Sequence, residues 1–165
     1  MTLARASLPD WKMTTEGRSE IREAAELLPE HHRVLDERLD RIVVGTQVRD
    51  AAELRAEWSD FERELLRHLE YEEAEILPGF ATDSPAEARA ILAEHADIRA
   101  TLADLGMRLD LHLLRSQAVE AFVQQLKAHA SRENDMLYTW ARARGAADDG
   151  RARRHRPSMF DGRIM

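Results

Sequence analysis

Residues 68–72, HLEYE, lie within the longest uninterrupted helical stripe of the sequence. Positions separated by three and four residues share one face of a helix, and this stripe keeps that spacing throughout. It contains Leu54, Trp58, Phe61, Leu65, His68, Glu72 and Ile76. His68 and Glu72 therefore take positions at which an apolar core should continue. Because ionisable side chains are costly to bury unless they are paired or bind a metal, His68 and Glu72 form either a hydrogen-bonded structural pair or a functional one.

A second stripe near the end of the chain repeats this pairing. It contains Val119, Phe122, Leu126, His129, Glu133, Met136 and Trp140. A separation of four residues is a rotation of about 40° and a rise of about 6 Å. His129 and Glu133, like His68 and Glu72, can therefore reach one bound ion or two adjacent ions.

Single histidines occupy two further apolar stripes. One contains Ile91, His95, Ile98, Leu102 and Leu105, and the other contains Leu28, His32, Leu35, Leu39 and Ile42. The neighbouring His31 shares its face with Arg38 and Arg41, which indicates a wetter environment. We therefore predict that His32 is the buried histidine, with His31 as the alternative.

Composition restricts the class of protein. The chain has 165 residues, of which 44% are apolar and 33% charged, as is typical of a single soluble, mostly helical domain. No apolar run reaches the length of a membrane span, and the N-terminus lacks the apolar core of an export signal, so we expect a cytoplasmic protein. With no cysteine, any metal must be held by imidazole and carboxylate groups. The net charge of −7 argues against nucleic acid as a partner.

Because no helical stripe is found at either end, the chain divides into an irregular arm at 1–18, a helical bundle at 19–145 and a flexible tail at 146–165. A short helix should lead into a long one that runs from Pro29 to Val44, with Gly45 as the stop. Asp50 is a good N-cap for the next helix, and Pro78 should end it. Ser84 with Glu87 reads as a capping box. The predicted long helices span 29–44, 50–77, 84–111 and 116–144.

Four amphipathic helices with short connections predict an all-α fold, an up-and-down antiparallel four-helix bundle. Along the chain the order is His, His-x-x-x-Glu, His, His-x-x-x-Glu, with nearly matching spacings in the two halves. The chain thus reads as two copies of one helical hairpin, each supplying half of a site.

Four imidazoles and two carboxylates are too many ligands for one tetrahedral zinc, and they suit iron or manganese in higher coordination. Two octahedral ions need about twelve bonds. Four histidines, two bridging carboxylates and an oxo or hydroxo bridge leave about one open position on each ion. Such a site binds a small ligand.

The arrangement resembles the haemerythrin-like domain, also called the HHE cation-binding domain, over roughly residues 25–144. The motifs that carry the resemblance are HHRVLDERLD, RHLEYEEAEILPGF, AEHADIRATL and LKAHASRENDMLYTWA. The resemblance implies two non-haem iron ions with an oxo or hydroxo bridge, which manganese or zinc could replace. It assigns His32, His68, His95 and His129 as terminal ligands and Glu72 and Glu133 as bridging ligands.

Oxygen-carrying members of that family use five histidines, whereas His112 here lies about 25 Å along its helix from His95, and His31 faces away. This departure argues against reversible oxygen storage, and the open coordination it leaves suits peroxide or NO chemistry, or sensing. The resemblance thus implies a protein that binds O2, NO or peroxide for sensing, detoxification or oxygen binding, with peroxidase-like, catalase-like or NO-related turnover left open. The expected partner is that small ligand, with no membrane and no nucleic acid, in a monomer or weak homodimer. Two alternative interpretations are an iron or redox sensor whose bundle responds to metal occupancy, and a structural bundle without metal. A ferritin-like site is disfavoured, because it needs a Glu-x-x-His motif that is absent here.

Residues around the pairs receive structural roles from the sequence. We assign Glu70, Glu73 and Glu75 to the solvated surface, with Glu75 as a minor candidate for an outer ligand. Tyr71 and Tyr138 flank the pairs and are assigned to packing, with a hydrogen bond to a bound ligand as the alternative. Met136 is placed near the site. We also expect His32→Ala to lower the iron content and His31→Ala to leave it near that of the wild type.

Overall fold

The computed structural model describes residues 15–48 and 50–144, and side chains from Ala25 onward except at 47–49. The predicted tail, and the part of the predicted arm before residue 15, lie outside these ranges. The described chain is helical apart from short connections. Its elements are α1 (Thr15–Val48), α2 (Ala51–Tyr71), the π-helical η1 (Glu72–Ile76), α3 (Leu77–Asp83), α4 (Pro85–Asp110), α5 (Ser116–Arg132) and the π-helical η2 (Glu133–Leu137), followed by helical residues 138–144.

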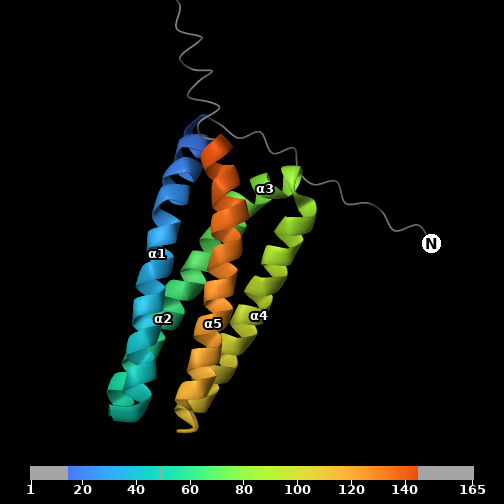
Figure 1. Ribbon diagram of the computed structural model, residues 1–165. Coiled ribbons are helices and arrows are strands. Elements are labelled where there is room, and N and C mark those ends of the chain that lie inside the picture. The colour runs from blue at the N-terminus through green and yellow to red at the C-terminus, as the bar shows by residue number, and fades with distance from the viewer. Residues whose placement is uncertain (1–14, 49, 145–165) are drawn as a thin grey trace, which may run out of the picture.

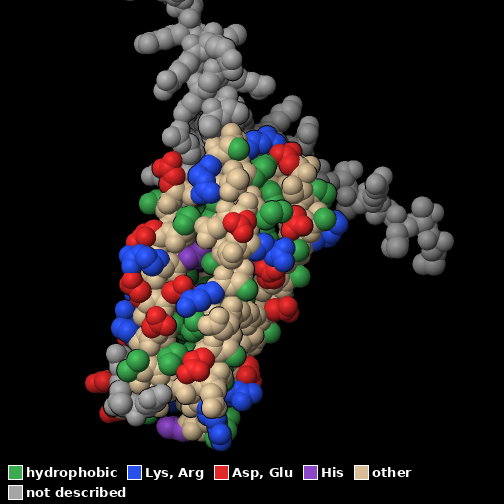
Figure 2. Space-filling model, viewed as in Figure 1, with side chains coloured by type: hydrophobic (Ala, Val, Ile, Leu, Met, Phe, Trp, Pro, Cys, Tyr) green, Lys and Arg blue, Asp and Glu red, His purple; other side chains and the backbone are tan. Residues whose placement is uncertain are grey.

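The helices form a closed ring of four long rods (Figure 1). α1 packs against α2 and α5, and α4 packs against the other sides of α2 and α5. This is the predicted antiparallel four-helix bundle, and it confirms the all-α fold class. The face seen in Figure 2 mixes acidic and basic side chains. Among residues 15–48 and 50–144, none of the helices combines the length and the apolar composition of a membrane span.

Two apolar clusters fill the bundle, one on each side of the histidines. The larger cluster includes Leu35, Leu65, Ile98 and Leu126, and the smaller cluster includes Leu28, Ile76, Ile91 and Leu137. Along each rod, the site histidine lies between a residue of the larger cluster and a residue of the smaller cluster. The polar residues therefore form a layer that is sealed from water at both ends by apolar side chains.

α1 is longer than predicted. It begins at Thr15, runs through Pro29 and Gly45 without a break, and ends at Val48. An interior proline leaves the carbonyl four residues earlier without its usual N–H donor. Here that carbonyl belongs to Ala25, and the Arg142 side chain donates to it at 3.3 Å. The helix therefore tolerates Pro29 because a neighbouring segment supplies the missing donor.

The predicted caps have mixed outcomes. Asp50 is confirmed, because its carboxylate accepts a hydrogen bond from the Ala52 N–H at 2.8 Å. The capping box at Ser84 is wrong: α4 does begin after Ser84, but that side chain makes no capping bond, and Glu87 instead pairs with Arg132 at 3.1 Å. Pro78 does not end the second rod either, since it lies in the first turn of α3, where a proline is tolerated.

The two π-helical segments change the register of the rods that contain them. In η2 the backbone N–H of Tyr138 bonds to the carbonyl of Glu133, five residues earlier, so one extra residue is inserted into the turn. The buried positions after Glu133 consequently become Leu137, Tyr138 and Ala141. Met136, which we predicted to lie near the site, is 38% exposed. That prediction is wrong because it assumed an unbroken α-helical period.

Candidate metal centre

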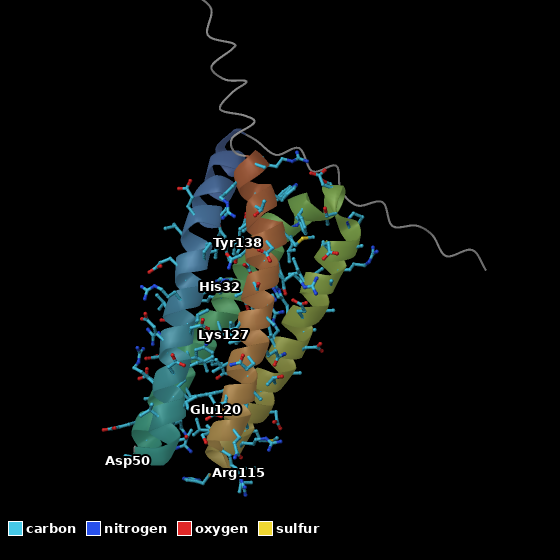
Figure 3. The ribbon with its side chains drawn as sticks, in the orientation of Figure 1. His32, Asp50, Arg115, Glu120, Lys127 and Tyr138 are labelled. Atoms are coloured by element: carbon cyan, nitrogen blue, oxygen red, sulfur yellow. The ribbon has the colours of Figure 1, made fainter. Side chains whose placement is uncertain are left out.

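The six residues singled out in the sequence lie together in the middle of the bundle. His32 comes from α1, His68 from α2, His95 from α4 and His129 from α5. Glu72 and Glu133 are the first residues of η1 and η2. All except His32 are buried, and the His32 side chain is only 12% exposed. Figure 3 labels His32 midway along the bundle, with Tyr138 nearby and Asp50 and Arg115 at the far end.

The histidines form two pairs. The rings of His32 and His68 lie 4.5 Å apart between centroids, and those of His95 and His129 lie 4.8 Å apart. The first pair comes from α1 and α2, and the second from α4 and α5. Each helical hairpin therefore supplies one pair, in agreement with the near-repeat of the sequence.

Each glutamate faces both pairs with different oxygens. Glu72 directs Oε1 to His68 Nε2 at 3.3 Å and Oε2 to His95 Nε2 at 3.6 Å. Glu133 directs Oε2 to His32 Nε2 at 3.2 Å and Oε1 to His95 and His129 Nε2 at 3.2 and 3.1 Å. Neighbouring ligands of one ion with bonds of about 2.1 Å lie about 3 Å apart. The described side chains therefore offer two metal positions that share both carboxylates: His32, His68, Glu72 and Glu133 in one, and Glu72, His95, His129 and Glu133 in the other.

The unsatisfied polar atoms support a cation at this place. His32 Nε2, His68 Nε2, His129 Nε2 and Glu72 Oε2 are buried and lack a hydrogen-bond partner among the described residues. Buried polar atoms are nearly always bonded, and leaving one unpaired is costly. Nitrogen and oxygen lone pairs that converge in an apolar surrounding are satisfied together by metal ions. The donor set thus fits a pair of cations.

The π-helical segments aim the carboxylates. A π turn widens the helix by one residue, and such turns are frequent at functional sites. Both segments start at the shared glutamates, and their last hydrogen bonds return to the carbonyls of Glu72 and Glu133. The site is therefore built by the same local distortion in both halves of the fold.

The outward-facing ring nitrogens of three histidines have partners. His95 Nδ1 lies 2.9 Å from Glu73, and His129 Nδ1 lies 3.0 Å from Glu94. His68 Nδ1 lies 2.8 Å from Nδ1 of His31, whose ring stacks on that of His68. The predictions that Glu73 is a surface charge and that His31 faces away are wrong. Glu73 follows Glu72 and is turned toward α4, and His31 is turned toward α2 rather than toward solvent.

Tyr138 is a further site residue that the sequence assigned to packing. Its side chain is fully buried, and its hydroxyl donates to Glu72 and lies 3.4 Å from Glu133 Oε2. Burial, together with the charges of Glu133 and Glu72, raises the pKa of Tyr138 well above its ordinary value. The phenol is therefore a neutral donor to the shared carboxylates. The equivalent position in the first half is Leu77, so the near-repeat gave no signal for it.

Charges inside the centre are strongly coupled. Burial opposes ionisation of Glu133, but its close contacts with His129, His32 and His95 outweigh the effect of burial and hold the pKa of Glu133 well below the ordinary value. Burial likewise lowers the pKa of His129, yet Glu133 and Glu94 more than compensate and raise it to about 9. In the metal-free protein, bound protons therefore balance the negative charge that metal cations can balance.

Other candidates lie apart from the cluster. His112 is exposed beyond the end of α4, and Glu75 is exposed on η1. Glu94, which contacts His129, was not singled out from the sequence, because its role depends on how α4 faces α5.

Comparison with known proteins agrees with this geometry. The model of the hemerythrin HHE cation-binding domain matches residues 23–141. No curated protein and no solved structure matched the chain. The matched range contains all six residues of the cluster and both π-helical segments. The chain belongs to the hemerythrin HHE cation-binding domain family.

Proposed function

We propose that this protein holds two non-haem iron ions and uses them to bind a small ligand such as O2, NO or hydrogen peroxide. The observation that carries the proposal is the pair of buried carboxylates, each facing both histidine pairs. His32 and His68 would hold one ion, His95 and His129 the other, and Glu72 and Glu133 would bridge them. Bound iron would supply open coordination positions and electrons for a small ligand.

The donor set favours iron over zinc. Structural zinc takes four ligands, often thiolates, whereas a mixture of imidazole and carboxylate with shared oxygens suits metals of higher coordination. The chain has no cysteine. Manganese or zinc can occupy the same donors, since affinity alone does not set metal selectivity.

The protein contributes rigidity and exclusion of water. Both apolar clusters close the layer of ligands, and a cavity of about 10 Å³, close to the room one water molecule needs, adjoins His32, His68 and His129. A ligand of two or three non-hydrogen atoms matches this space better than an organic substrate does. Tyr138 holds Glu72 by a hydrogen bond and keeps its carboxylate in place.

The test is the response of iron-loaded protein to small ligands. Absorption in the visible range should change when NO or peroxide is added, and Glu133→Gln, which alters a shared ligand, should abolish the change. Glu120→Gln, an exposed substitution on α5, is the matched control and should respond like the wild type. An iron-loaded wild-type protein whose spectrum ignores NO, peroxide and O2 would contradict the proposal.

A sensor is the second candidate, and the placement of the π-helical segments favours it. Because each segment begins at a shared glutamate, loss of the ions would release the residues that keep the π turns formed. Amide hydrogen exchange should then rise at 72–77 and 133–138 when metal is removed. Unchanged exchange in these segments would favour a ligand-binding protein with a rigid metal-free bundle.

A further inference from the structure

Three of the four seams between neighbouring rods are closed beside the centre by pairs of opposite charges. These pairs are Arg38–Glu64 between α1 and α2, Glu73–Arg99 between η1 and α4, and Glu94–Arg132 between α4 and α5. Glu73 and Glu94 also bond to the outward-facing nitrogens of His95 and His129. On these three sides, bonded side chains therefore separate the centre from solvent.

The seam between α1 and α5 is closed less firmly. It has Asp36 on α1 and Lys127 on α5, and among the described residues neither takes part in an ion pair. The side chain of His32 is 12% exposed, against 4% or less for the other three site histidines. Figure 2 shows a histidine side chain at the surface between α1 and α5, at the place where Figure 3 labels His32. This seam is therefore the most open side of the centre.

The small cavity lies between this seam and the centre. Its volume is about 10 Å³, and three site histidines line it together with Asp36. The other lining residues are apolar: Leu35, Leu65, Leu69, Leu126 and Ala130. Among the residues that line the cavity, Asp36 is therefore the one carboxylate.

A wider groove on the α4/α5 seam does not offer the same access. It has a volume of about 280 Å³ and also reaches His129. Glu94 lines this groove and bonds to His129 Nδ1, the nitrogen that faces away from the centre. A molecule in the groove would therefore meet the outer side of the ring.

The charge of Asp36 has no structural explanation in its contacts. The side chain is partly buried, and burial raises the pKa of its carboxyl group, while Lys127 and His32 act in the opposite direction. A carboxylate that is partly removed from water without a bonded partner costs stability. A neutral side chain of similar size would fill the seam at a lower cost. The charge can instead act on whatever enters the cavity.

We propose that Asp36 is the specificity-determining residue at the entrance to the metal centre, which opens between α1 and α5. Its negative charge attracts incoming metal cations, repels anions and leaves neutral molecules unaffected. The ligands that enter are therefore uncharged, as O2, NO and hydrogen peroxide are, whereas small anions such as azide, nitrite or superoxide are held back. This inference rests on the proposed function, since it assumes that small ligands reach bound iron.

The rates at which azide and hydrogen peroxide associate with iron-loaded protein measure this selectivity. At neutral pH azide is an anion and hydrogen peroxide is uncharged, so the ratio of the two rates reports on charge and not on the width of the opening. Asp36→Asn should raise the azide-to-peroxide ratio about 3- to 10-fold at low salt, and salt should reduce this gain. Lys127→Gln should lower the ratio. Asp40→Asn is the matched control, because Asp40 is exposed on α1 and does not line the cavity.

Metal uptake by the metal-free protein gives a second readout with the opposite sign. The association rate of Co²⁺ should fall about 3- to 10-fold in Asp36→Asn and stay near that of the wild type in Asp40→Asn. The number of ions bound at saturation should not change, because Asp36 is not a ligand in the proposal. A general loosening of the bundle would speed the entry of azide and Co²⁺ alike, so opposite shifts separate an effect of charge from a structural one.

Two results would overturn the proposal. One is an azide-to-peroxide ratio that is the same in Asp36→Asn and Asp40→Asn, and the other is a Co²⁺ association rate that does not fall in Asp36→Asn. Either result would leave the proposed function standing, since metal and ligand would still bind. A wild-type protein that takes up neither Co²⁺ nor iron would instead refute the proposed function itself.

Discussion

Replacement of Tyr138 by phenylalanine removes one hydroxyl group from the centre and should destabilise the metal-free protein. Tyr138 is fully buried, and its hydroxyl is a hydrogen-bond donor to the shared carboxylate of Glu72. Tyr138→Phe keeps the ring, its contacts in the smaller apolar cluster and its packing against His32, and deletes only the donor. The variant therefore reports on the hydrogen bond and hardly on packing.

The magnitude follows from the charge of the acceptor. A hydrogen bond to a charged group contributes about 1.5–3 kcal/mol, and a buried carboxylate that loses its donor has no water to replace it. For a domain of this size that corresponds to a fall in Tm of about 3–12 °C. We expect metal-free Tyr138→Phe to be less stable than the wild type by this amount.

Urea unfolding of the metal-free proteins, followed by circular dichroism, is the assay. Tyr71→Phe is the control, because Tyr71 is 38% exposed and solvent can replace what its hydroxyl contacts, so its loss should stay within about 0.5 kcal/mol. If Tyr138→Phe were no less stable than Tyr71→Phe, the hydrogen bond from Tyr138 to Glu72 would not be stabilising the folded protein, and its assigned role in the centre would be refuted.

Three further predictions concern the scaffold and pH. Asp50→Ala should cost about 1 kcal/mol in urea unfolding, because the Ala52 N–H loses its cap; an unchanged midpoint would contradict the cap. Arg142→Ala should lower the free energy of unfolding by about 0.5–1.5 kcal/mol in the wild type. The loss should be smaller in a Pro29→Ala background, because the restored N–H of residue 29 can bond to the Ala25 carbonyl. Equal losses in a double-mutant cycle would show that Arg142 does not replace the donor that Pro29 lacks. The pKa of His129 is about 9 in the folded metal-free protein, against an ordinary value of 6.5. The stabilisation from protonated His129 is therefore complete below pH 6.5 and is lost as the pH rises through about 9. Thermal melts whose Tm does not fall over this range would contradict the raised pKa.

The bundle and the six central residues could be predicted because both depend on local periodicity. Four stripes at helical spacing define four rods, and a histidine or glutamate on such a stripe must face the core. The choice of His32 over His31 as the inward residue agrees with the contact of His32 with Glu133. Short connections then leave an antiparallel ring as the simple way to bury all four stripes.

The register after Glu133 could not be predicted, because a π turn has no strong sequence signal. One extra residue moved Tyr138 into the centre and Met136 toward solvent. The ends of α1 were missed for a related reason: the helix passes Pro29 only because Arg142, far along the chain, supplies a donor. Sequence windows do not contain such partners.

The residues that contact the outward-facing ring nitrogens of the site histidines were missed, because these contacts depend on how the helices face one another. Glu73 contacts a histidine of α4, Glu94 one of α5, and His31 one of α2. Each lies beside a predicted ligand in the sequence, one residue off the core stripe, where a charged or polar side chain normally faces solvent. Only the packed bundle turns these positions toward another helix.

The metal content of protein purified from iron-supplemented cells, measured for the wild type and for Glu72→Gln with Glu133→Gln, shows whether the six residues hold iron. We expect about two irons per wild-type chain, lost in the double variant while the protein stays helical. A folded wild-type protein that takes up no iron, manganese or zinc would refute the metal centre, and the buried histidines and glutamates would then be a structural network alone.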